Sequence, residues 1–105
     1  MSVITHQKLV RDRIPQIIEE SGKSCRTRIL SREEYLTMLD RKLTEELAEY
    51  QESKSMEEIA DLLEVIRAVV KARGSSMEEV EAIRREKAEK RGGFEEKIFL
   101  VDVSE

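Results

Sequence analysis

Apolar residues recur at helical spacing in two long stretches of the chain. Between residues 32 and 52 they stand three or four positions apart, which places them on one face of a helix. These positions are Leu36, Leu39, Leu43, Leu47 and Tyr50. A second stretch begins at Ser55 and has a wider apolar sector, which Val65, Ala68 and Ala72 extend. We predict a long helix in each stretch, with the second at the centre of the fold.

Local start and stop signals bound these helices and predict two more. Ser31 followed by Glu34 is a capping-box pattern that opens the first long helix. Pro15 suits the first turn of a short helix that ends near Gly22. A fourth helix is predicted to begin near Ser76 and to end before a pair of glycines.

Two further segments have strand character. Residues 25–30 alternate enough to form a short strand, and residues 97–103 are rich in β-prone side chains. The chain has 105 residues and 12.2 kDa, which suits one domain over residues 1–105. The predicted fold is all-α, a bundle of four to five helices with a small two-stranded element formed by these segments.

Composition narrows the classes of function. The chain is 39% hydrophobic and 40% charged with one proline, as expected for a helix-rich folded protein. A formal net charge of -4 argues against binding nucleic acid or an anionic membrane. No run approaches the ~20 apolar residues of a membrane span, and the start lacks a signal-peptide core, so we expect a cytoplasmic protein. Because so small a core gains from a partner subunit, we also expect a homodimer or homotetramer.

The chain contains one cysteine and one histidine, Cys25 and His6. A disulfide framework and a zinc site built from cysteine and histidine are therefore excluded. We predict that Cys25 is a reduced packing residue, and we assign no role to His6.

The candidate functional residues are two acidic pairs, Glu46 with Glu49 and Glu58 with Asp61. Residues three apart lie about 60° apart around a helix, so each pair projects from one face. Two antiparallel helices joined by a short turn could bring all four carboxylates together, where they would repel unless a cation neutralised them. Such hard oxygen ligands suit Mg²⁺ or Mn²⁺. The alternative is that they are solvated faces of charged helices, and spacing alone leaves both interpretations open.

Glu58 has a further structural interpretation. Residues 55–58 read Ser-Met-Glu-Glu, a capping-box pattern in which Glu58 bonds back to the first residue of the pattern. Residues 76–79 repeat these four residues, but Ala82 stands three positions later, where Asp61 follows Glu58. Capping therefore explains both glutamates and leaves the aspartate unexplained, since aspartate is unfavourable within a helix.

The acidic segment also resembles a known family. Residues 42–49, KLTEELAE, and 58–63, EIADLL, resemble the E-x-x-E then E-x-x-D signature of the MazG-like all-α nucleoside triphosphate pyrophosphohydrolases. Residues 8–15, KLVRDRIP, and 91–94, RGGF, resemble a small single-domain branch of that superfamily labelled phosphoribosyl-ATP pyrophosphohydrolase-like. Eight residues separate the two acidic pairs, a shorter connection than in typical MazG proteins.

The resemblance implies a Mg²⁺-dependent enzyme that hydrolyses a nucleoside triphosphate to a monophosphate and pyrophosphate, in the house-cleaning of nucleotide pools. The metal ligands that it implies are Glu46, Glu49, Glu58 and Asp61, with Mn²⁺ as a possible substitute for Mg²⁺. It implies that Glu45 orients or deprotonates the attacking water. The candidate cations for phosphate binding are Lys8, Arg11, Arg13, Lys42, Lys87, Lys90 and Arg91.

Two alternatives remain open at this stage. One is hydrolysis of phosphoribosyl-ATP in histidine biosynthesis. The other is a noncatalytic helical module whose apolar faces form an oligomer or partner interface and whose carboxylates are solvated.

Overall fold

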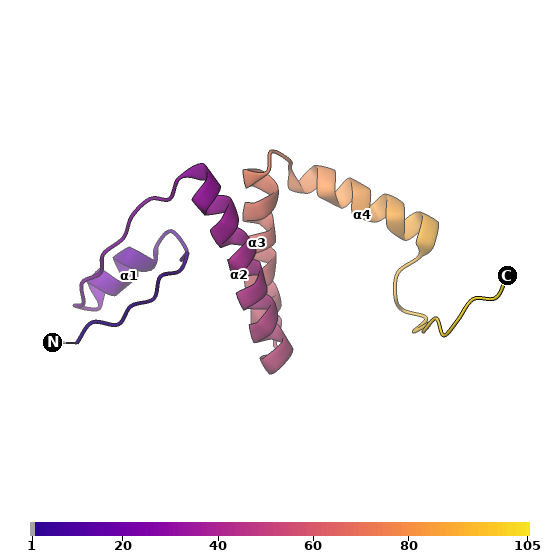
Figure 1. Cartoon of the computed structure of the whole chain (residues 1–105), viewed down its shortest axis with the longest axis horizontal. Helices are drawn as coiled ribbons and strands as arrows, with labels where there is room; N and C mark the ends of the chain where they lie inside the picture. The colour runs from indigo at the N-terminus through magenta and orange to yellow at the C-terminus, as the bar shows by residue number, and fades with distance from the viewer. Residues whose placement is uncertain (1) are drawn as a thin grey trace.

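The computed structural model describes residues 2–105, and these contain four helices and no strand (Figure 1). The helices are α1 (Ile14–Glu20), α2 (Arg32–Ser53), α3 (Met56–Ala72) and α4 (Met77–Arg91). The predicted all-α fold is confirmed. The predicted starts of α2, α3 and α4 and the predicted ends of α1, α2 and α4 lie within about two residues of the observed bounds. No helix within residues 2–105 combines the length and the apolar character needed to cross a membrane.

Serine caps explain where the longer helices begin. The Ser31 hydroxyl accepts the backbone N–H of Glu34, and the Glu34 carboxylate accepts the N–H of Ser31, so the capping box of α2 is complete. Ser55 and Ser76 likewise accept a backbone N–H three residues into α3 and α4. Each such cap contributes about 1 kcal/mol to helix stability.

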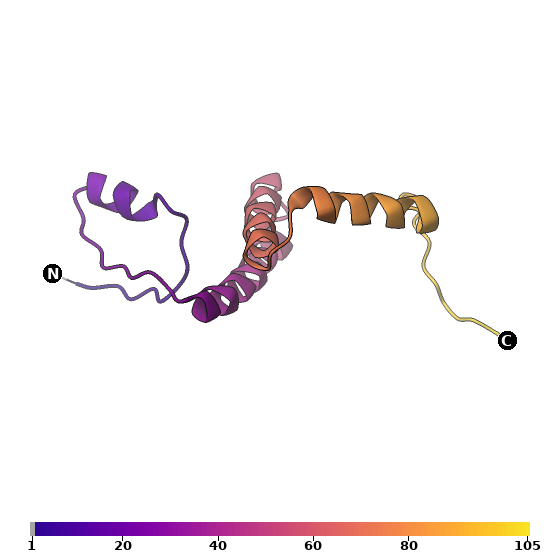
Figure 2. The same ribbon diagram turned by 90° about the horizontal axis from the view of Figure 1, so that it is seen from above.

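The α2–α3 hairpin is the centre of the molecule. Lys54 adopts a left-handed backbone conformation, with φ of 59°, and donates its N–H to the Tyr50 carbonyl at 2.7 Å. Only Lys54 and Ser55 separate the two helices, which therefore run antiparallel and pack along their length (Figures 1 and 2). Leu39 of α2, 3% exposed, is the one buried apolar residue among the described residues.

The outer helices leave the hairpin on opposite sides (Figures 1 and 2). The turn after α3 uses Gly74, whose φ of 84° is accessible to glycine without strain. From this turn α4 extends away from the hairpin, touching α3 but not α2. The chain measures 66 × 31 × 24 Å along its principal axes, so it is elongated.

The predicted two-stranded element is not formed. Residues 25–30 precede α2 on one side of the hairpin, whereas residues 97–103 follow α4 on the other side (Figure 1). Strand pairing requires backbones about 4.8 Å apart, and the hairpin stands between these two segments. Their β-prone side chains are consequently exposed, including Ile29 at 95% and Phe99 at 86%.

Candidate metal centre

Three carboxylates from α2 and α3 converge near the closed end of the hairpin. Glu46 lies in the second half of α2, and Glu58 and Asp61 lie in the first turns of α3. One oxygen from each residue lies within 4.8 Å of the corresponding oxygens of the other two. The antiparallel course and the two-residue turn therefore bring together acids that are up to fifteen positions apart in the sequence.

Two carboxylate oxygens in this group are buried without a hydrogen-bond partner. They are Oε2 of Glu46 and Oε2 of Glu58. The Glu46 side chain is only 9% exposed, and its other oxygen, Oε1, lies 3.6 Å from the Lys42 ammonium. A buried acceptor without a partner destabilises the fold, and it does so more strongly when it is charged. The cluster therefore contains carboxylate oxygens without a partner, whose negative charge a hard cation would neutralise.

The surroundings of Glu46 and Glu58 disfavour their charged forms. Burial is the main cause that raises the pKa of Glu46, and contact with the Glu49 carboxylate raises it further. The pKa of Glu58 is raised by the same two causes in the same order. Glu49 is exposed, but it interacts with both of these residues and so stands at the edge of the cluster.

Glu58 does not use its carboxylate as a helix cap. The Ser55 hydroxyl accepts the backbone N–H of Glu58 at 3.4 Å, which is the first half of a capping box. The second half is replaced, because the Ser55 N–H donates to the Ser53 hydroxyl at 3.2 Å. The Glu58 carboxylate is thereby available to the cluster, and Asp61, one turn later, joins it there.

The repeated sequence at the start of α4 behaves differently. The backbone N–H of Glu79 also donates to a serine hydroxyl, that of Ser76, at 3.2 Å. Its carboxylate, however, accepts the hydroxyl of Ser75 at 2.6 Å within the preceding turn. The same four residues thus place one glutamate in a polar turn and the other in the carboxylate cluster.

The amino-terminal arm, residues 2–13, contributes cations to the rim of the cluster. Arg11 Nη2 lies 2.7 Å from Asp61 Oδ1, and Lys8 Nζ lies 3.5 Å from Glu45 Oε1. Both predicted phosphate-binding residues therefore stand beside carboxylates of the hairpin. Arg11 and Asp61 are fifty positions apart, so no local sequence pattern predicts this ion pair.

Lys42 and Glu45 form a second polar group on α2. The Lys42 ammonium lies 3.4 Å from Glu45 Oε1 and 3.6 Å from Glu46 Oε1. These pairs have i,i+3 and i,i+4 spacing on one helix, so they can be recognised from the sequence alone. Glu45, predicted as the catalytic residue, is thus bound to two lysines and stands outside the three-carboxylate group.

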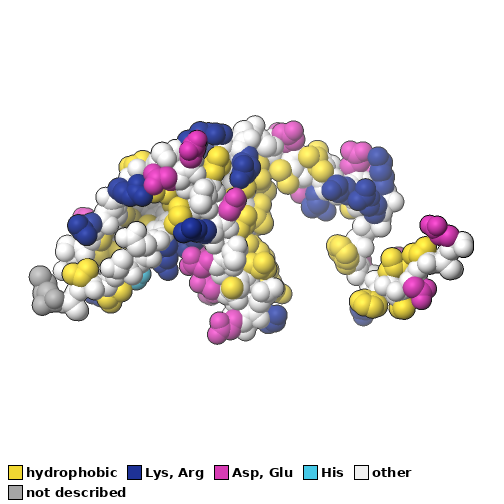
Figure 3. Space-filling view, in the orientation of Figure 1, with side chains coloured by type: hydrophobic (Ala, Val, Ile, Leu, Met, Phe, Trp, Pro, Cys, Tyr) yellow, Lys and Arg dark blue, Asp and Glu magenta, His cyan; other side chains and the backbone are white. Residues whose placement is uncertain are grey.

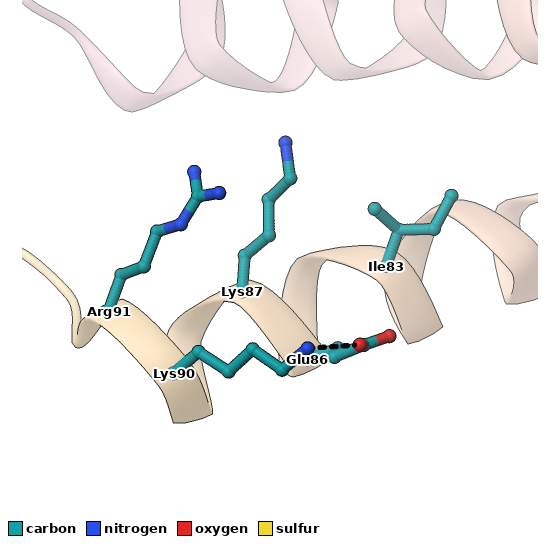
Figure 4. Close-up of a pocket in the computed structure, with 5 residues that line it drawn as sticks. All are labelled: Ile83, Glu86, Lys87, Lys90 and Arg91. Atoms are coloured by element: carbon teal, nitrogen blue, oxygen red, sulfur yellow. Dashed lines mark hydrogen bonds and ion pairs between the residues drawn. The ribbon is translucent and has the colours of Figure 1, made fainter.

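The other predicted phosphate-binding cations are not brought to the cluster of their own chain. Arg13 is the N-cap residue of α1, where its side chain makes no capping hydrogen bond, and it makes no ion pair with any described residue. Lys87, Lys90 and Arg91 lie on the part of α4 that extends away from the hairpin (Figures 1 and 4). Lys90 is paired with Glu86 at 2.9 Å.

The described residues form an all-α protein with a cluster of three carboxylates that could hold a metal ion. No family model matches the chain, and no solved structure matches it. A segment of 42 residues, 40% of the chain, is 55% identical to an uncharacterized protein of Mycolicibacterium smegmatis (strain ATCC 700084 / mc(2)155). The aligned part spans 43% of that protein, so the similarity extends to less than half of either chain.

Proposed function

We propose that Glu46, Glu58 and Asp61, with Glu49 at their edge, bind Mg²⁺ and that the protein hydrolyses a nucleoside triphosphate to a monophosphate and pyrophosphate. The observation that supports the metal site is the pair of buried, partnerless oxygens within a group of three carboxylates. The reaction is supported by the resemblance of residues 42–49 and 58–63 to the MazG-like signature.

The contacts within the cluster suit this role. Lys42 holds Oε1 of Glu46, which leaves Oε2 as the oxygen that can bind a cation. Two glutamates and an aspartate offer only hard oxygen donors, which Mg²⁺ and Mn²⁺ prefer. When bound, such an ion neutralises phosphate charge and lowers the pKa of a coordinated water.

The cations of the amino-terminal arm can bind the phosphates of the substrate. The side chains of Arg11 and Lys8 are 57% and 45% exposed, so they can turn from carboxylates to phosphate oxygens. A cation held by Asp61 would neutralise its carboxylate, and Arg11 would then be free to contact phosphate. Hydrolysis then joins the oxygen of water to the α-phosphorus, breaks the bond to the bridging oxygen and releases pyrophosphate. Glu45, at the rim, is the candidate acceptor of the water proton.

Two measurements test the two parts of this proposal. Thermal melts with MgCl₂, against NaCl at equal ionic strength, should show a higher melting temperature with Mg²⁺, because the ion binds the native state. Pyrophosphate release should be measured with canonical, deoxy and damaged nucleotides and with phosphoribosyl-ATP. Equal melts in the two salts would overturn the metal site. Stabilisation by Mg²⁺ without release from any nucleotide would leave the metal site and overturn the reaction.

A further inference from the structure

The amino-terminal arm is held on the hairpin by two ion pairs and very little packing. The pairs join Arg11 to Asp61 at 2.7 Å and Lys8 to Glu45 at 3.5 Å. Of the arm residues, only Leu9 is half-buried, and the others are exposed. The helix that follows, α1, has no buried residue and does not pack against another helix within residues 2–105 (Figures 1 and 2). Loss of the two ion pairs would therefore free the arm.

Both ion pairs involve carboxylates of the candidate metal centre or next to it. Asp61 belongs to the three-carboxylate group, and Glu45 precedes Glu46 on α2. Within residues 2–105, the cations paired with these acids are Lys42 of the hairpin and the two from the arm. Figure 3 shows Lys and Arg side chains beside Asp and Glu side chains where the hairpin faces the amino-terminal segment. The arm therefore supplies positive charge where the proposed metal ion would also supply it.

Arg11 and a divalent cation would bind the same carboxylate. Oε2 of Glu46 and Oε2 of Glu58 have no partner, so they can bind a cation without losing a contact. Asp61 differs from them, because its Oδ1 already accepts a hydrogen bond from Arg11. An ion held by all three carboxylates would repel the guanidinium beside Asp61, since both are positively charged. Binding of the ion and docking of the arm therefore oppose each other, and each weakens the other by the same factor.

The contacts of the arm are weak compared with those that the ion would make. Both members of each ion pair are partly exposed to water, which screens their attraction. A divalent ion carries twice the charge of a guanidinium and would contact three carboxylates, one of them buried. We therefore expect a saturating concentration of the ion to displace Arg11 from Asp61.

We propose that residues 8–11 form a strap that docks on the hairpin while the carboxylate cluster is free of metal and is released when a divalent cation binds. Asp61 couples the two events because it is both a cluster member and the partner of Arg11. This inference rests on the proposed function, in which the strap sets the order of binding. The cation binds first and frees Lys8 and Arg11, which then contact the phosphates of the nucleotide.

The first test measures the distance between the strap and the hairpin by double electron–electron resonance. Spin labels are placed at Gln7→Cys and Gln51→Cys, two exposed and uncharged positions, in a Cys25→Ser chain. Labelled chains are diluted into unlabelled protein, so that only distances within one chain are measured. The distance distribution should be narrow without divalent ions and broad in saturating MgCl₂, and NaCl at equal ionic strength should not reproduce the change. A pair within the hairpin, Gln51→Cys with Arg67→Cys, should not respond to MgCl₂.

A variant without the two ion pairs separates the strap from the metal site. Lys8→Gln/Arg11→Gln should give the broad distribution without any metal, while its helical circular dichroism stays unchanged. A narrow distribution for this variant would overturn the strap. The strap would also be wrong, and the metal site intact, if MgCl₂ raised the melting temperature of the parent without changing its distance distribution. If MgCl₂ changed neither quantity, the metal site and the release of the strap would both be overturned.

The second test is the reciprocal effect on the affinity for Mg²⁺, measured by isothermal titration calorimetry without nucleotide. Arg11→Gln removes the competing contact and should bind Mg²⁺ about two- to fivefold more tightly, as expected for loss of an exposed ion pair. The control is Arg13→Gln, which removes the same charge two positions away, from a side chain without an ion pair in residues 2–105, and should bind like the parent. Equal affinities of the two variants, or weaker binding by Arg11→Gln, would overturn the competition. Neither test uses catalysis, so failure of the proposed reaction does not affect them.

Discussion

At the residue scale, the proposed metal site makes Asp61 a carboxylate for which a cation would compete with Arg11. Arg11 lies 2.7 Å from one of its oxygens, and the residue belongs to the group whose oxygens lie within 4.8 Å of one another. We expect Asp61→Asn to lower divalent-dependent hydrolysis at least about 100-fold, because one ligand charge is lost. It should also remove most of the melting-temperature rise with Mg²⁺, while the helical circular dichroism stays unchanged.

Asp40→Asn is the matched control for that change. Asp40 also pairs with an arginine, Arg73, at 3.3 Å, but this pair is exposed and is not part of the cluster. Each variant therefore loses one exposed ion pair worth at most about 1 kcal/mol. If both variants kept full turnover and the full response to Mg²⁺, Asp61 would have no metal role.

Glu58 and Glu79 allow a second comparison between residues in the same local sequence. Both donate a backbone N–H to a serine hydroxyl, so replacement by glutamine leaves each cap intact and should change stability by less than about 1 kcal/mol. Glu58→Gln should need more Mg²⁺ for half-saturation and should lose most turnover, whereas Glu79→Gln should behave like the parent. Titrations at limiting Mg²⁺ measure this difference, and identical curves would remove Glu58 from the site.

At the scale of elements, the packing of α2 on α3 perturbs the titration of the cluster. The pKa values of Glu46 and Glu58 are raised above the ordinary 4.5, mainly by burial and then by Glu49. Their protonated forms therefore stabilise the metal-free fold. This contribution is complete below the unfolded value of 4.5 and is lost as the pH rises through the raised folded values.

Melting temperatures of the metal-free protein should accordingly fall as the pH rises from the ordinary carboxyl pKa toward neutrality. Glu46→Gln should flatten this dependence and should stabilise the metal-free protein at neutral pH, because it removes a buried charge. The response to Mg²⁺ should increase with pH in the parent, since protons and the ion compete for the same oxygens. Glu34, whose pKa Arg28 lowers to about 2, loses its contribution only in more acidic solution. Identical pH profiles for the parent and Glu46→Gln would contradict the perturbed titration of the cluster.

At the scale of the whole molecule, the elongated shape leaves apolar side chains exposed that a second copy could cover. We therefore expect a homo-oligomer, and because unfolding of an oligomer releases separate chains, its melting temperature rises with protein concentration. We expect this rise for the parent and for Ile29→Asp, which changes a side chain before α2 that is 95% exposed, measured by differential scanning calorimetry over a wide concentration range. Leu63→Asp, which places a charge on an apolar side chain of α3 that is 49% exposed, should melt at a lower temperature that does not depend on concentration. A concentration-independent melt of the parent would indicate that the single chain is the stable unit.

Much of the fold and the carboxylates of the candidate site could be predicted from the sequence. The helix bounds depend on interactions within a few residues, such as the Ser31 cap, Pro15 in the first turn of α1 and the Gly74 turn. The convergence of Glu46 with Glu58 follows from two local facts, helical periodicity and a short turn. These features are encoded locally because helical hydrogen bonds and caps join residues at most four positions apart.

Only the tertiary structure decided which partner each polar group has. It placed the Glu58 carboxylate in the cluster, where the sequence allowed a cap, and it bound Glu45 to two lysines. It brought Arg11 to Asp61, and it kept Lys87 away from the cluster of its own chain. It also separated residues 25–30 from residues 97–103, so these two β-prone segments do not pair as strands. These outcomes depend on how helices are placed relative to one another, and that placement comes from packing between residues distant in sequence, which no local pattern records.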